Sequence, residues 1–119
     1  MYLEVYVFNS TSVKEEQVHY EETLPSFPSN EVLKGEIEAK VPNIGWTDKE
    51  TGRVENLDFQ GQLILGNVNN DKVVYFRITG GSDPFKLILE LCQANGWTSY
   101  TPENGQFLEV DMDTIEYWE

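Results

Sequence analysis

The fold is decided by the stretch KVVYFRITGGSDPFKLILELCQANG, residues 72–96. Its first part, residues 72–79, is mainly β-branched or aromatic and apolar on both faces, which predicts a strand. Gly80 and Gly81 then interrupt this pattern, and Pro84 suits the first turn of a helix, where no backbone N–H is needed. We therefore expect a strand followed directly by a helix.

Residues 83–95 carry the clearest helical pattern in the chain. Apolar side chains recur at the i, i+3, i+4, i+7 spacing of one helix face: Phe85, Ile88, Leu89 and Cys92. Three further apolar residues widen this face: Leu87, Leu91 and Ala94. Ser82 or Asp83 can cap the start of the helix. Gly96 can take the left-handed conformation that ends a helix, so we expect a well-buried helix here.

Other segments have the period of two that is typical of strands. Residues 2–8 alternate, and both of their faces are rich in apolar or aromatic side chains, as in a central strand. Residues 57–65 place an apolar residue or Gly61 at every second position: Leu57, Phe59, Gly61, Leu63 and Leu65. The glycine in this row indicates a bulge or the close approach of another backbone. Short strands are expected at residues 97–101 and 106–111, on either side of the turn sequence PENG.

Four segments are less regular. Residues 36–41 alternate charged and apolar side chains, which predicts a short strand ended by the proline that follows. Residues 43–53 are rich in turn-forming residues, and residues 66–71 have the composition of a hairpin loop. Residues 9–30 contain a weak capping signal but are too polar for a regular helix, and their prolines favour a loop.

These elements predict a single domain, residues 1–119, of the α+β class. We expect a mainly antiparallel sheet of about six strands, with one main helix at about residues 83–95 packed on one face. Three Trp, six Tyr and six Phe distinguish the chain from a disordered acidic polypeptide. A chain of this length can bury a core without disulfides or metals.

The chain is strongly acidic, with 21 Asp and Glu against eight Lys and Arg and a net charge of −13. Nucleic acids are bound by neutralising their phosphates with basic side chains, so we expect no nucleic-acid binding. Anionic membrane surfaces are disfavoured for the same reason. A basic protein partner would be attracted. Plain solubility is the alternative explanation of the charge.

The cysteine content and the N-terminal residues bear on the compartment. One cysteine cannot form a disulfide within the chain, so an oxidising compartment is not favoured. The first residues, MYLEVYVFNS, show neither the basic start nor the small-residue cleavage site of a signal peptide. No apolar run approaches the ~20 residues that span a membrane. We expect a cytoplasmic protein, and the sequence leaves its oligomeric state open.

Few side chains have a setting that favours catalysis or metal binding. His19 is surrounded by carboxylates, which favour the protonated ring and weaken it as a base. Cys92 lies on the apolar face of the expected helix, near its C-terminal end, where a thiol is structural rather than reactive. Asp83 would repel a phosphate from the glycine turn before it. We therefore assign no catalytic residue, no metal ligand and no cofactor.

The acidic residues are concentrated towards the C-terminus. All eight bases lie between Lys14 and Lys86, and residues 87–119 contain seven acids and no base. Three of these acids stand at i, i+2 and i+4 and would share one face of the expected strand. They form the candidate partner-binding site together with three neighbours: Glu109, Asp111, Asp113, Glu116, Tyr117 and Trp118. An acid-coated strand that discourages edge pairing is the alternative.

The charge and this candidate site favour a small acidic, non-enzymatic binding protein that docks a basic protein, of the inhibitor, immunity or adaptor type. One alternative is an enzyme that uses paired carboxylates, with or without a divalent cation. That alternative requires a pocket holding two acids with raised pKa values. Another alternative is a structural or oligomer-forming domain, which the apolar second faces of residues 2–8 and 73–78 would favour.

Overall fold

The computed structural model describes residues 3–18, 23–41, 43–65, 72–103 and 105–108. Within them the chain forms seven strands and three helices. Their bounds are β1 Leu3–Phe8, α1 Glu15–Val18, α2 Asn30–Glu38, β2 Gly45–Trp46, β3 Thr51–Glu55, β4 Gln60–Ile64, β5 Val73–Gly80, α3 Pro84–Asn95, β6 Thr98–Thr101 and β7 Gln106–Phe107. The hairpin loop expected at residues 66–71 lies outside the described residues.

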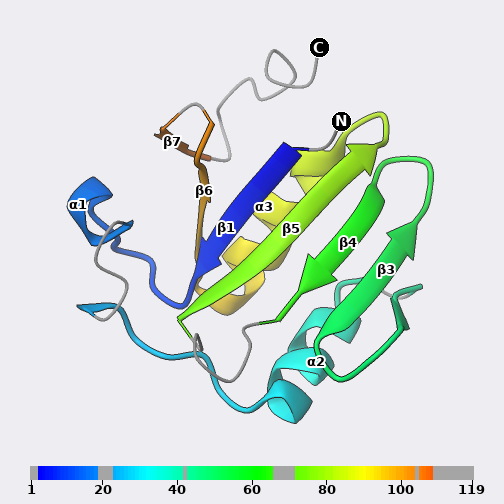
Figure 1. The fold of residues 1–119 in the computed structure, drawn as a ribbon, viewed down its shortest axis with the longest axis horizontal. Coiled ribbons are helices and arrows are strands. Elements are labelled where there is room, and N and C mark those ends of the chain that lie inside the picture. Colours follow the sequence, from blue (N-terminus) through cyan, green and yellow to red (C-terminus); the bar gives the residue numbers. More distant parts are fainter. Residues whose placement is uncertain (1–2, 19–22, 42, 66–71, 104, 109–119) are drawn as a thin grey trace.

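The strands form one sheet in the order β2-β3-β4-β5-β1-β6-β7, and every neighbouring pair is antiparallel (Figure 1). β1 lies inside the sheet between β5 and β6, which confirms the prediction of a central strand. It pairs with β5 along its whole length, from Leu3 opposite Ile78 to Phe8 opposite Val73. This architecture confirms the α+β class and the mainly antiparallel sheet, with one strand more than the predicted number.

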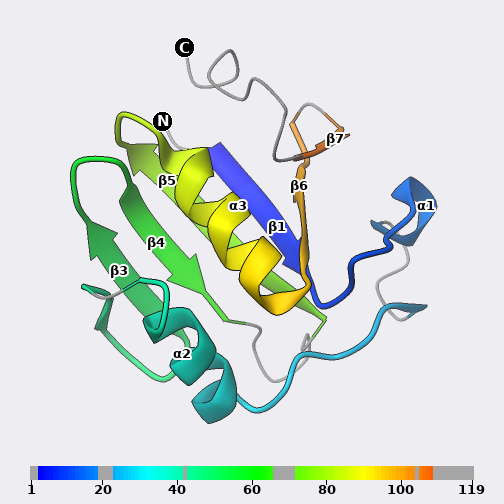
Figure 2. The ribbon, with the colours of Figure 1, turned by 180° about the vertical axis from the view of Figure 1, so that it is seen from behind.

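Both longer helices pack on the same face of the sheet. Figure 2 shows α3 lying along β1 and β5, with α2 beside β3 and β4. Twenty buried residues form one cluster between this face and the helices, here called the helix-side cluster. It joins Val5 and Phe76 of the central strands to Ile88 of α3 and Ile37 of α2. The expected packing of the main helix on one face is therefore confirmed.

The opposite face carries a smaller buried group, here called the second cluster: Phe8, Val18, Leu24, Val73 and Tyr100. Val18 ends α1, and Leu24 lies in the proline-containing segment that follows. Residues 9–30, too polar to predict a regular helix, thus contribute the apolar side chains that cover this end of the sheet. This explains why β1 is apolar on both faces.

The start and end of α3 follow the sequence signals closely. Pro84 occupies the first turn, and Gly96 ends the helix in the left-handed region at φ 69°. Asp83 stands at the N-cap position, but its side chain makes no capping hydrogen bond. The turn sequence PENG is also confirmed, because Gly105 has φ 62°.

The strand expected at residues 36–41 was a wrong prediction, because residues 36–38 belong to α2 and the rest of the segment is turn or irregular. The buried side chains of the helix are Leu33 and Ile37, which are four residues apart and so share one helical face. A period of two over only three apolar residues cannot exclude a helix, and the pattern becomes helical once Leu33 is included. Val41 is still buried, but it lies beyond the helix end.

The row of apolar residues expected over 57–65 begins later than predicted. β4 starts at Gln60, and Leu57 lies in the turn between β3 and β4 with 84% of its surface exposed. The part of the row from Phe59 to Leu65 is buried as expected. Gly61 confirms both of its predicted roles, because the register shifts beside it and a Cβ there would collide with the Arg77 carbonyl oxygen. The turn-rich segment 43–53 contributes β2 and the start of β3.

Candidate functional site

The six residues predicted to bind a partner all lie outside the described residues: Glu109, Asp111, Asp113, Glu116, Tyr117 and Trp118. β7 ends at Phe107, and the description ends at Leu108. The shared strand face of the three acids, and the extension of the last strand to residue 111, therefore stay predictions. His19 also lies outside the described residues.

A hollow of about 580 Å³ lies where the C-terminal end of α3 meets β6, β7 and residues 11–13. Its lining includes Val13, Leu89, Cys92, Trp97, Ser99 and Phe107. These residues are uncharged, and the aromatic and aliphatic groups give the hollow an apolar wall. Among the described residues, the lining of this hollow includes no carboxylate, whereas the enzyme alternative requires a pair.

Cys92 lines this hollow but is poorly suited to nucleophilic chemistry. Burial raises the pKa of its thiol to about 12, and the Ser99 hydroxyl, which acts in the opposite direction, has the smaller effect. The reactive form of cysteine is the thiolate, which is scarce at neutral pH when the pKa lies so high. The structural role predicted for Cys92 is consistent with its burial in the helix-side cluster.

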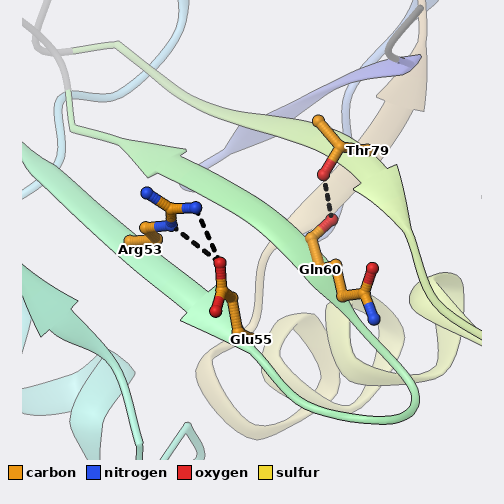
Figure 3. Close-up of polar contacts among 4 residues, drawn as sticks. All are labelled: Arg53, Glu55, Gln60 and Thr79. Carbon is orange, nitrogen blue, oxygen red and sulfur yellow. Dashed lines mark hydrogen bonds and ion pairs between the residues drawn. The ribbon is translucent and has the colours of Figure 1, made fainter.

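The sheet face opposite the helices becomes polar beyond the second cluster, over β3, β4 and the end of β5. Figure 3 shows Arg53 and Glu55 side by side on β3, with Arg53 Nη2 2.7 Å from Glu55 Oε1. The Thr79 hydroxyl donates a hydrogen bond to the backbone oxygen of Gln60 across the sheet. These residues border a shallow hollow of about 490 Å³. Arg53 and Glu55 are both 63% exposed, so water screens their attraction.

The turn between β3 and β4, residues 56–58, is here called the Leu57 turn. Its backbone is held by the Asn56 side chain, whose Oδ1 accepts hydrogen bonds from the N–H of Asp58 at 3.0 Å and of Phe59 at 2.7 Å. Asparagine side chains readily accept hydrogen bonds from the backbone of a turn, so Asn56 was a signal in the sequence for a turn directly after β3. The apolar row over residues 57–65 instead predicts that Leu57 belongs to the strand.

The Leu57 turn is also tied to the loop that precedes α3. The N–H of Ser82 donates to the Leu57 oxygen at 3.0 Å, and the N–H of Asp83 donates to the Asp58 oxygen at 3.1 Å. The Ser82 hydroxyl donates to Asp58 Oδ1 at 2.8 Å. Gly81 has φ 121° and lies so close to Asp58 that a Cβ would collide with its carbonyl oxygen. Ser82, predicted as a possible helix cap, thus joins the two loops instead.

No protein-family model, curated protein or solved structure matches this chain. Across the described residues, His, Cys, Asp and Glu form no group of three or more that could hold a metal ion. None of the helices in the described part of the chain is both long and apolar enough to cross a membrane.

Proposed function

We propose that this chain is a small acidic, non-enzymatic binding protein that docks a basic protein surface, in the manner of an inhibitor, an immunity factor or an adaptor. The acids would steer the encounter with the partner and an aromatic side chain would anchor it. The proposed contact residues remain Glu109, Asp111, Asp113, Glu116, Tyr117 and Trp118. A cytoplasmic location, expected from the single cysteine, is part of this proposal.

The observation that supports this proposal best is the uneven distribution of charge. Residues 87–119 hold seven acids and no base, so no basic side chain of this segment offsets them. Two basic side chains on the sheet form ion pairs with acids of the sheet. Arg53 Nη2 lies 2.7 Å from Glu55 Oε1, and Arg77 Nε lies 4.0 Å from Glu4 Oε1. A field of one sign raises the rate at which an oppositely charged partner arrives.

The experiment begins with the full chain immobilised and exposed to lysate from its native source. Captured proteins are eluted with a salt gradient and identified by mass spectrometry, and the captured protein is then made recombinantly. We expect a basic protein whose association rate falls by tenfold or more between about 50 and 300 mM salt. Association that does not change with salt would contradict the proposal.

A pair of charge-matched variants tests the location of the contact. The first carries E109Q, D111N, D113N and E116Q, and the second carries E16Q, E31Q, E36Q and E50Q, all outside residues 87–119. Both lose four negative charges, so a general effect of net charge would slow the association of both equally. We expect the first variant to associate about tenfold more slowly and the second to change less. Equal rates would show that the C-terminal acids have no special role.

A further inference from the structure

Leu57 stands out among the apolar side chains because it is exposed on a fixed backbone. Among the described residues, the large hydrophobic side chains that are exposed are Leu57, at 84%, and Val32, at 52%. A single exposed leucine is common on protein surfaces and needs no explanation by itself. What distinguishes Leu57 is the set of hydrogen bonds that holds its turn.

The turn is fixed from two directions. Asn56 holds it from within through two backbone N–H groups. Ser82 and Asp83 hold it from outside through the carbonyl oxygens of Leu57 and Asp58. A side chain on a backbone that is already ordered loses less conformational entropy on binding, so more of its contact energy appears as affinity.

The surroundings of Leu57 suit a protein surface of defined chemistry. Beside the turn lies a hollow of about 320 Å³ between the turn and α3, and half-buried Leu87 contributes to its lining. Its charged lining residues are Asp58, Glu90 and Lys86, so acids outnumber bases. The Asp58 carboxylate is held in place by the Ser82 hydroxyl. The apolar side chains of Leu57 and Leu87 are therefore bordered by polar and charged groups, and an apolar centre with a polar rim is the usual arrangement of a protein interface.

We infer that the Leu57 turn is a docking surface, and that Leu57 inserts into an apolar pocket on a basic protein partner. The bases of the partner face Asp58 and Glu90. This inference rests on the proposed function for the sign of the partner's charge. It adds a second contact, formed by the turn between β3 and β4 and the neighbouring first half of α3, to the acidic residues near the C-terminus.

The test uses the full chain with p-benzoylphenylalanine at position 57, and a matched chain with the same photoreactive residue at position 32. Each is irradiated in lysate from its native source, and the crosslinked protein is identified and made recombinantly. The dissociation constant is then measured for the wild type, Leu57→Ser and Val32→Ser. Thermal melts confirm that both variants remain folded, as expected for exposed positions.

We expect crosslinking at position 57 well above that at position 32, to a basic protein. Leu57→Ser should weaken binding by about tenfold or more, and Val32→Ser by less than about twofold. If position 57 crosslinks no more than position 32, or if both variants bind alike, the inference is wrong. The proposed function survives that result if the partner captured by the immobilised chain still binds in a salt-dependent manner. If Leu57→Ser loses binding but the captured partner is acidic or binds independently of salt, Leu57 is a contact residue and the claim that the partner is basic is wrong.

Discussion

The two faces of the sheet are buried in different ways. The face that packs on α2 and α3 is covered by regular helices over a cluster of twenty buried residues, as far as the chain is described. The opposite face holds a cluster of five, covered by a short helix and a proline-containing segment, and then becomes polar. The difference shows that an apolar second face of a strand does not by itself indicate an oligomer, because a neighbouring segment of the same chain can bury it.

The largest effect is expected from Phe76→Ala on the helix-covered face. Phe76 is fully buried and stacks edge-on against Phe59, so the substitution removes apolar contact and leaves a cavity. We expect a loss of about 4–5 kcal/mol in the free energy of unfolding, measured by urea denaturation. A loss that large would leave a typical domain barely folded.

Phe8→Ala makes the same change on the other face, where Phe8 is also fully buried. We expect a smaller loss, about 3 kcal/mol, because a short helix and a loop can move to fill the space. Hydrogen exchange should become faster in residues 13–18 while α3 stays protected. Equal losses for Phe8→Ala and Phe76→Ala would mean that the segment covering the second cluster fills the space no better than the two helices do.

The Cys92 thiol reports how well the helix-side cluster excludes water. Its pKa is raised from 9.0 to about 12, so the unfolded chain releases the proton first as pH rises. The stability that this group contributes is complete below pH 9 and is lost towards pH 12, at about 1.4 kcal/mol per pH unit. Between pH 8 and pH 10 the wild type should therefore lose about 1.4 kcal/mol more than Cys92→Ala. Parallel pH curves would mean that water reaches the thiol.

The smallest effect is expected for the Arg53–Glu55 pair on the polar part of the opposite face. A double-mutant cycle of Arg53→Ala and Glu55→Ala should give a coupling below about 1 kcal/mol, because both side chains are well exposed. The coupling should fall further in 0.5 M salt, which screens exposed charges. A coupling energy above about 2 kcal/mol would mean that the two side chains are less exposed to water than the structure indicates.

The sequence predicted best those elements whose signals are local. α3 was predicted from Pro84, Gly96 and one helical face, β1 from its period of two, and β5 from its β-branched and aromatic residues. α2 was missed because three alternating residues fit a strand as well as a helix, and tertiary packing of Leu33 and Ile37 decides between them.

The candidate surfaces were harder to predict because they depend on contacts between distant segments. The hydrogen bonds that join the Leu57 turn to Ser82 connect residues 25 positions apart, and no local pattern indicates them. Val18 and Leu24 likewise pack against Val73, which lies far from them in the sequence, so no local pattern indicates this contact. The acidic site at residues 109–118 was predicted from charge, strand spacing and two neighbouring aromatic residues, and charge gives an attraction without fixing a geometry.

The outermost strands of the described sheet are its shortest. β2 and β7 span two residues each, whereas β5 in the middle spans eight. Within the described residues, the short edge strand β2 offers few free main-chain groups, so a second chain that approaches this border finds little to pair with. Fibril growth by strand addition is thereby discouraged at this border.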